Sequence, residues 1–200
     1  GSKLVLLGII FAAVSMLYIV AFETFSKFFK AVLKNQYLIM AVGGGIVALL
    51  TLVLQSNEYL GTGISQIPDL LFVSAPWYVF LLKILFTAVS LGAGFKGGEI
   101  APAMFVGASL GSFLAPMFGL PIPLVVACGM AAVFCGVTNS PITAIVFSVE
   151  LFGASQIYYT MICVAVSYLI SEYFSIYKTQ KIMYSKYSTT FINRKSHHID

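Results

Sequence analysis

The residues best suited to chemistry lie in a glycine-rich turn, where one carboxylate stands at the expected start of a helix. Glu99 follows Gly97 and Gly98 and precedes Ile100-Ala101-Pro102 in a mostly apolar stretch. Glycine amides are not obstructed by side chains, proline fits the first turn of a helix, and the first N–H groups of a helix have no intrahelical partner. Such a helix end binds anions. A carboxyl group beside it could also take up or release a proton.

Glu99 has a second, structural interpretation. Its charge could interact with the positive end of the helix or pair with Lys96, and either contact would contribute modestly to stability. A third interpretation uses the GxGxxG spacing of Gly92, Gly94 and Gly97. That pattern binds dinucleotides only after a buried strand in a soluble α/β unit. Because a long apolar helix is expected before these glycines, we reject the dinucleotide interpretation.

A second break in the apolar pattern falls at Thr138-Asn139-Ser140-Pro141. Asn139 or Ser140 is expected to cap a short helix that begins at Pro141. Glu150 lies near the C-terminal end of that helix, where the helix dipole disfavours a negative charge. We expect it to bond to a neighbouring element as a structural clamp, with a role in transport as the alternative. Tyr177 follows the last apolar run, where interfacial tyrosines are common.

The composition of the chain indicates a membrane protein. Of 200 residues, 60% are hydrophobic and 9% charged, and the mean hydropathy is +0.97. Soluble domains carry about 25% charged residues. The composition therefore excludes a soluble enzyme, a nucleic-acid-binding domain, a disulfide scaffold and a disordered segment. The cysteines Cys128, Cys135 and Cys163 lie in apolar segments without metal-ligand spacing, and we expect them to be small core residues.

About five segments are long and apolar enough to cross a bilayer, and several others are too short. The longer segments are residues 4–22 with an amphipathic extension to 33, then 37–54, 77–93, 120–137 and 156–174; the shorter ones include 67–73, the helix after Pro102 and residues 142–152. Broken helices at membrane depth are tolerated where they line a cavity, and in transporters they indicate the substrate site.

Two features inside the predicted spans have alternative explanations. The run Gly43-Gly44-Gly45 either lets another helix pack closely or kinks its own helix. Lys83 either extends to the membrane interface or meets a packed polar partner, in preference to a role in transport.

The basic residues predict the orientation of the chain. Lys27, Lys30 and Lys34 follow the first span, whereas the loop around Glu58 and Asp69 has no basic residue. A second basic group occupies the C-terminal stretch and comprises Lys178, Lys181, Lys186, Arg194 and Lys195. By the positive-inside rule both groups face the cytoplasm, and the Glu58 loop lies across the membrane. Because Gly1 stands where an initiator methionine would, we expect the gene to begin upstream.

Taken together, these motifs resemble the C-terminal half of the CLC family of chloride channels and anion/proton antiporters. The similarity covers residues 4–187 and is most specific at two places. The segment Gly98-Glu99-Ile100-Ala101-Pro102 is similar to the family's GxFxP anion-binding motif, and the approach from Leu82-Lys83 to Gly97 also fits. The run Asn139-Ser140-Pro141-Ile142-Thr143-Ala144, continuing to Glu150-Leu151, is the second place. Gly61-Thr62-Gly63 and Ser175-Ile176-Tyr177 stand where the family has such residues.

The resemblance implies an all-α polytopic membrane protein with the CLC inverted-repeat fold, of which this chain is the second repeat. Residues 1–188 would form the C-terminal transmembrane half and residues 189–200 a polar tail. The resemblance implies that amides around Gly98, Glu99 and Ile100 and the hydroxyl of Tyr177 hold the anion. The family's serine loop and gating glutamate belong to the N-terminal half and are not found here, so we expect that half as a partner.

The chain departs from the family motif at two positions. Ile100 replaces the phenylalanine, which leaves the amide available but changes the pore wall. Glu99 is unusual for chloride carriers and resembles the fluoride-transporting subgroup. We therefore expect fluoride/proton antiport with Glu99 as the proton-coupling group. The alternatives are a chloride channel or chloride/proton antiporter and, from another class, a non-transporting membrane assembly subunit.

The resemblance also implies a homodimer with one pathway per subunit. We expect the short helix from Ile142 and the span 156–174 to form the dimer interface, through a face comprising Ile157, Met161, Val164, Tyr168 and Ile170. No Ser/His pair, paired Asp or metal-ligand cluster appears in the spans, so we expect neither an enzyme nor a cofactor, and no nucleic-acid partner. The short tail is similar to prokaryotic members, which favours a bacterial plasma membrane with a cytoplasmic C-terminus.

Overall fold

The structure is a computed structural model that describes residues 2–56, 59–171, 174–177, 180–186 and 191–195. In these ranges the chain forms seven α-helices and one two-stranded antiparallel sheet. The helices are α1 (Ser2–Val32), α2 (Gln36–Leu54), α3 (Tyr78–Gly92), α4 (Ile100–Phe118), α5 (Ile122–Thr138), α6 (Pro141–Phe152) and α7 (Ile157–Ile170), and the strands are β1 (Lys181–Tyr184) and β2 (Phe191–Lys195). The predicted all-α class is confirmed for the helical body, whereas the sequence did not predict the hairpin.

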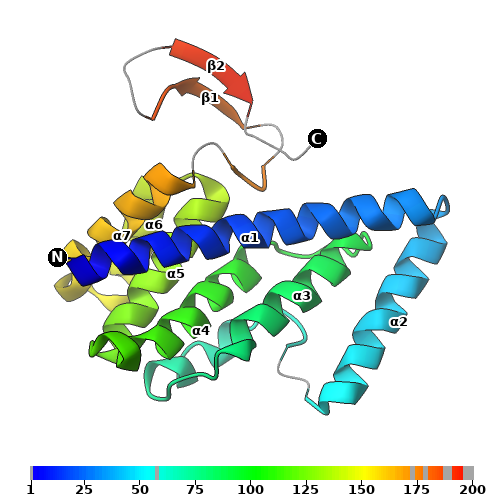
Figure 1. Cartoon of the computed structure of the whole chain (residues 1–200), viewed down its shortest axis with the longest axis horizontal. Coiled ribbons are helices and arrows are strands. Elements are labelled where there is room, and N and C mark those ends of the chain that lie inside the picture. Colours follow the sequence, from blue (N-terminus) through cyan, green and yellow to red (C-terminus); the bar gives the residue numbers. More distant parts are fainter. Residues whose placement is uncertain (1, 57–58, 172–173, 178–179, 187–190, 196–200) are drawn as a thin grey trace.

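The long helix α1 organises the helical body. Figure 1 shows α1 extended along the long axis of the molecule, with α3, α4 and α5 beside it, α6 and α7 near its N-terminal end and α2 folding back from its C-terminal end. The hairpin stands apart from the helices (Figure 1). It is joined to them through Lys186, whose Nζ donates a hydrogen bond of 2.7 Å to the carbonyl of Tyr168 in α7.

Within the described part of the chain, three helices are long and apolar enough to span a membrane: α1, α2 and α4. Because α1 has 31 residues, its length is about 46 Å, which exceeds the roughly 30 Å hydrocarbon core of a bilayer. The sequence predicted about five spans. Helices α3, α5 and α7 are apolar but shorter than these three, whereas α4, which was grouped with the shorter segments, is long enough. Helix α3 has 15 residues, α5 has 17 and α7 has 14.

Local sequence explains where several helices begin and end. Asn35 precedes α2 and its side chain accepts a hydrogen bond from the amide of Tyr37. Helix α4 ends at Gly119, which adopts φ +60, a conformation that glycine reaches without steric cost. Pro121 then precedes α5. The segment between α2 and α3 forms two 3-10 turns at Ile64–Gln66 and Asp69–Leu71, so the apolar piece at 67–73 is too short to span, as predicted.

The core is built around close contact between α4 and α5. A Cβ atom added to Gly107 would overlap the backbone carbonyl of Gly129, and one added to Gly111 would meet the carbonyl of Val125 at 2.5 Å. Such distances let the two helix backbones touch, as small residues do in membrane interfaces. Side chains from α1, including Phe11 and Tyr18, complete this core. All three cysteines are buried and free, which confirms that they are small core residues.

The glycine run in α2 serves packing. A Cβ atom on Gly43 would overlap the Cβ of Ala93, whereas one on Gly45 would meet nothing within 4 Å. Helix α2 continues through all three glycines. The close-packing interpretation is therefore confirmed at Gly43, and the helix is not broken there.

Substitution of Gly107 should separate α4 from α5. We expect Gly107→Ala to lower the free energy of unfolding by about 1–3 kcal/mol, because the added methyl group overpacks a backbone contact. Gly45→Ala is the matched control: it adds the same methyl group to a helix with open space around it and should be neutral or stabilising by up to about 1 kcal/mol. Thermal unfolding of the purified protein in detergent would measure both. Equal stability of the two variants would contradict the close packing.

Candidate anion site at the start of α4

Glu99 occupies the N-cap position of α4. Its backbone has φ −80 and ψ −26, and its side chain makes no capping hydrogen bond to the helix. The first amides of α4 therefore receive no bond from this carboxylate, although they lack intrahelical partners. Glu99 therefore stands at the N-terminal end of α4 without capping it through a hydrogen bond. Glu99 is only partly buried, so its side chain remains accessible from the cavity that it lines.

The glycine-rich turn lies between two cavities. One cavity, of about 220 Å³, is lined by the part of the turn that contains Gly97 and Gly98 and is called the Gly98 cavity. It is lined by Tyr59, Leu60, Gly61, Thr62, Phe86, Thr87, Ser90, Leu91, Phe95, Lys96, Gly97, Gly98 and Pro102. A Cβ atom on Gly98 would meet nothing within 4 Å, so its backbone faces open space.

The second cavity, of about 410 Å³, contains Glu99 in its wall and is called the Glu99 cavity. It is lined by Phe22, Ser26, Lys30, Gln36, Ile39, Leu91, Gly92, Ala93, Gly94, Glu99 and Ile176. Leu91 lines both cavities. The turn that carries Gly98 and Glu99 thus separates two spaces, with Lys96 facing one and Lys30 facing the other. This arrangement places a cation on each side of the turn, which would attract an anion toward it.

One face of α1 forms a wall of this site. Tyr18, Phe22, Ser26 and Lys30 are spaced by four residues and therefore lie along the same side of the helix. The hydroxyl of Tyr18 donates a hydrogen bond of 2.7 Å to the backbone carbonyl of Glu99, and the other three residues line the Glu99 cavity. The sequence prediction missed this face. The four-residue spacing of polar and aromatic residues was the available signal, but Lys30 was considered only for membrane orientation.

The predicted site residues are brought together only in part. Gly98 and Glu99 lie in adjacent cavity walls, and Ile100 is partly buried against the core of α1, α4 and α5. Tyr177 is 42% exposed and does not belong to either lining. Its neighbour Ile176 does line the Glu99 cavity, and the amide of Ile176 donates to the carbonyl of Val137 at 3.1 Å.

Comparison with known proteins decides the family. Residues 2–172 match the family described as voltage gated chloride channel. The chain belongs to this family. The resemblance inferred from the GxFxP-like motif is therefore confirmed.

Two relatives and one solved structure illustrate the similarity. The chain is 37% identical over 187 residues to the chloride/fluoride channel protein of Pseudomonas syringae pv. tomato, covering 90% of this chain and 41% of the relative. It is 29% identical over 172 residues to the H(+)/Cl(-) exchange transporter ClcA of Yersinia pestis bv. Antiqua, covering 78% of this chain and 36% of the relative. A crystal structure of a CLC-type fluoride/proton antiporter matches with a TM-score of 0.82 and 34% identity, over 88% of this chain and 45% of the other. The chain thus spans less than half the length of these chloride channel family members.

The second segment of the family resemblance, at the start of α6, follows the prediction only in part. Helix α6 does begin at Pro141, but Ser140 makes no side-chain capping bond. Asn139 instead adopts the left-handed conformation with φ +57 as the C-cap of α5, which turns its side chain away from a capping role. The Asn139 Oδ1 atom is buried and has no hydrogen-bond partner among the described residues. The predicted capping role is therefore wrong for Asn139, whereas Ser140 occupies the N-cap position as predicted but without the capping bond.

Lys83 holds the wall of the Gly98 cavity. Its side chain is fully buried at 0% exposure, and Nζ donates hydrogen bonds to the carbonyls of Tyr59 and Gly61 at 3.1 and 2.8 Å. The ammonium group also lies 5.3 Å from the ring centroid of Phe105. Of the two predicted environments for Lys83, the packed polar partner is confirmed. Since Tyr59 and Gly61 line the cavity, this lysine attaches the segment that follows α2 to helix α3.

Three other acidic residues differ in their exposure to solvent or lie outside the described residues. Glu150 is exposed near the end of α6, which gives no support to its role as a clamp within this chain. Glu23 in α1 is 6% exposed, and the sequence prediction overlooked this buried carboxylate. Glu58, like Lys178 of the C-terminal basic group, lies outside the described residues.

Replacing Lys83 should loosen the segment around Tyr59. We expect Lys83→Met to lower the free energy of unfolding by about 2 kcal/mol, because the carbonyls of Tyr59 and Gly61 lose a charged donor. Lys96→Met provides the control, since Lys96 faces the same cavity but is exposed, and its removal should change stability by less than about 0.5 kcal/mol. Denaturation followed by tryptophan fluorescence would report both variants. A Lys83→Met protein as stable as Lys96→Met would refute the attachment.

Proposed function

We propose that the complete protein containing this chain exchanges a small halide, most favourably fluoride, for protons across a membrane. In this proposal the chain supplies the second half of the pathway. The observation that carries it is the position of Glu99: a carboxylate at the N-cap of α4, beside the first amides of that helix, in the wall of a cavity that Lys30 also lines. The names of the relatives, chloride/fluoride channel protein and fluoride/proton antiporter, support the same class of activity.

The chemistry of the site favours fluoride over chloride. Fluoride is small and accepts strong hydrogen bonds. A protonated Glu99 carboxyl could donate to it, and the backbone amides of Gly98, Glu99 and Ile100 could donate beside it. In the proposal, Glu99 takes up a proton from the side toward which fluoride leaves and passes it to the side from which fluoride came, so that the two ions cross in opposite directions. Tyr177 would add a hydroxyl donor after the N-terminal half has docked.

The runner-up is a chloride channel or chloride/proton antiporter, which the exchange transporter ClcA among the relatives supports. A non-transporting assembly subunit is the rival from another class. Ion flux through the complete protein distinguishes both from fluoride exchange.

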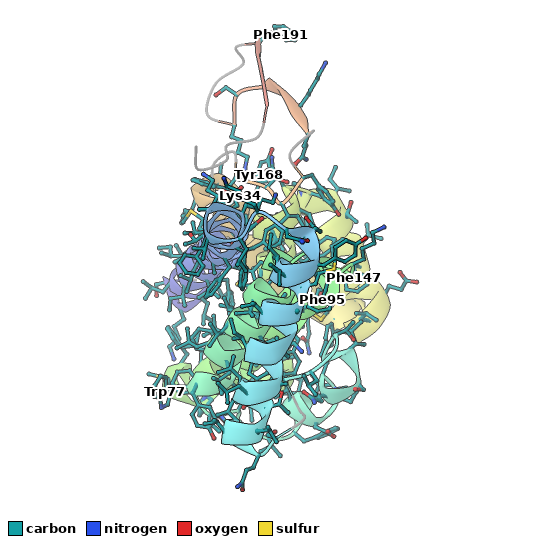
Figure 2. All side chains as sticks on the ribbon, turned by 90° about the vertical axis from the view of Figure 1, so that its right-hand side faces the viewer. Lys34, Trp77, Phe95, Phe147, Tyr168 and Phe191 are labelled. Atoms are coloured by element: carbon teal, nitrogen blue, oxygen red, sulfur yellow. The ribbon has the colours of Figure 1, made fainter. Side chains whose placement is uncertain are left out.

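The orientation in the membrane follows from charge. We propose that Lys27, Lys30, Lys34 and the basic hairpin face the cytoplasm of a bacterium, as the positive-inside rule requires. Figure 2 supports a common side for these groups: Lys34 and Tyr168 lie near the level of the hairpin, which carries Phe191, whereas Trp77 lies toward the opposite end. The C-terminus would then be cytoplasmic, and the Lys30 side of the Glu99 cavity would open to the cytoplasm.

We also propose that two subunits form a homodimer through α6 and α7, although Val164 does not belong to the interface. Val164, which the sequence placed on the interface, is fully buried against Ala131, Cys135 and Ala144. Helix α7 packs its Val164 side on α5 and α6, so its outer face lies elsewhere. The exposed apolar residues of the two helices include Ile142, Val146, Leu151, Tyr158, Met161, Ile162 and Leu169. Tyr158 is 76% exposed, so this face offers a large apolar surface to a second subunit.

The function is tested by ion flux through the complete protein in liposomes. We expect fluoride efflux coupled to proton uptake, with chloride moving much more slowly. Chloride moving as readily as fluoride would leave the runner-up. The absence of flux for both anions from a folded protein would favour the assembly subunit.

Glu99→Gln should separate coupling from folding. The amide keeps the size and hydrogen-bonding capacity of the carboxyl group but cannot ionise, so coupled exchange should fail while the protein stays folded and its stability changes by no more than about 1 kcal/mol. Tyr177→Phe is the contrast: it should weaken anion binding without abolishing proton movement. Parallel proton and fluoride fluxes would measure both. Coupled fluxes in Glu99→Gln would overturn the proton-carrying role.

The dimer is tested on the exposed face of α7. We expect Ile162→Trp to weaken dimerisation by about 1–3 kcal/mol, because a larger side chain overpacks the interface. Leu52→Trp, on the exposed face of α2, is the control and should leave the dimer intact. Single-molecule photobleaching at varied protein density in bilayers would give the two equilibria. An unchanged dimer in Ile162→Trp would reject this placement.

A further inference from the structure

Tyr18 is the side chain outside the predicted site that touches it most directly. It lies on α1, is 2% exposed, and donates its hydroxyl to the Glu99 carbonyl at 2.7 Å across 81 residues of sequence. This distance is the usual one for a well-formed hydrogen bond from a hydroxyl group to a carbonyl. The tyrosine ring is packed in the core with Val14 and Ile19, so its hydroxyl is held at a fixed place.

The carbonyl that Tyr18 binds belongs to the same peptide unit as the amide of Ile100. A trans peptide is planar, and its C=O and N–H point in opposite directions. Fixing the Glu99 oxygen toward α1 therefore turns the Ile100 N–H away from α1. This amide is one of the free N–H groups at the start of α4, and it is among those that the proposed function assigns to the anion.

The same hydrogen bond also changes the strength of that amide as a donor. A donor on a carbonyl oxygen polarises the peptide, and hydrogen bonds in such a chain strengthen one another. The sequence of contacts would be the Tyr18 hydroxyl, the Glu99 carbonyl, the Ile100 amide and the anion. Because the surroundings of Tyr18 are apolar and buried, the polarisation is less screened than in water.

We propose that Tyr18 is a positioning residue of the anion site, which orients the Glu99–Ile100 peptide and strengthens its amide toward a halide. This inference rests on the proposed function, since it assumes that an anion meets the Ile100 amide. Tyr18 itself does not contact the anion. It acts through the peptide, and it makes α1 a part of the site.

Tyr18→Phe removes the hydroxyl and keeps the ring. We expect the fluoride dissociation constant of the complete protein, measured by calorimetry with sodium fluoride, to rise about fivefold, which corresponds to the loss of one hydrogen bond. The coupling ratio of protons to fluoride should stay unchanged because Glu99 is intact. Ser15→Ala is the matched control: Ser15 is a fully buried hydroxyl on the same helix, and it bonds to the Ala12 carbonyl within α1. It should leave the dissociation constant unchanged.

A second variant keeps the test decisive if Tyr18→Phe folds poorly. Replacing Tyr18 with 3-fluorotyrosine makes the hydroxyl a stronger donor at nearly constant size, and fluoride should then bind more tightly than in the unmodified protein. A purely structural tyrosine would give no such gain. Unchanged affinity in both variants, in a protein that carries fluoride, would overturn the role of Tyr18 alone. An unmodified protein that binds and carries neither fluoride nor chloride would refute the proposed function, and the role of Tyr18 with it.

Discussion

The arrangement of this chain depends on one constraint: backbone N–H and C=O groups at membrane depth have no water to bond. An unbroken helix meets that requirement by itself, whereas a broken helix must find other partners. Here the break before α4 is supported on one side by the Tyr18 hydroxyl, and the segment after α2 is supported by the Lys83 ammonium. Those two side chains donate to carbonyls, whereas the first amides of α4 have no partner within their own helix.

A rigid frame is needed for such a site to keep its geometry. The contact of α4 with α5 through Gly107, Gly111 and Gly129 brings two backbones together, and close-packed helices resist small displacements. The glycine-rich turn lies between the regular helices α3 and α4 and is itself irregular. Its glycines permit the positive φ of Gly94 and leave the Gly98 backbone open.

Glycine, proline and isolated charged residues in the sequence made much of the helix pattern and the position of Glu99 predictable. Glycine and proline mark the turn before α4 and the start of α6, and a lone carboxylate among apolar residues marked Glu99. Contacts between distant segments were not predictable in the same way. In the sequence, Tyr18 is one of many aromatic residues in an apolar helix. Only the packing of α1 against α4 shows that its hydroxyl bonds to the Glu99 carbonyl. The predicted capping role of Asn139 was wrong because its left-handed backbone ends α5. The predicted place of Val164 in the dimer interface was wrong because sequence periodicity does not tell which face of a helix packs against the same chain.

Helix α1 contacts both ends of α4. Lys3 Nζ donates to the carbonyl of Phe118 at 2.7 Å, and Tyr18 donates to Glu99. The stretch of α1 between Lys3 and Tyr18 therefore has to match α4 in length. One residue inserted there would rotate Tyr18 by about 100° around the helix axis and shift it by about 1.5 Å. Substitutions in this stretch can accumulate during evolution as long as they pack, but insertions and deletions would break one of the two contacts, so the interval should keep a constant length among homologues that share both ends.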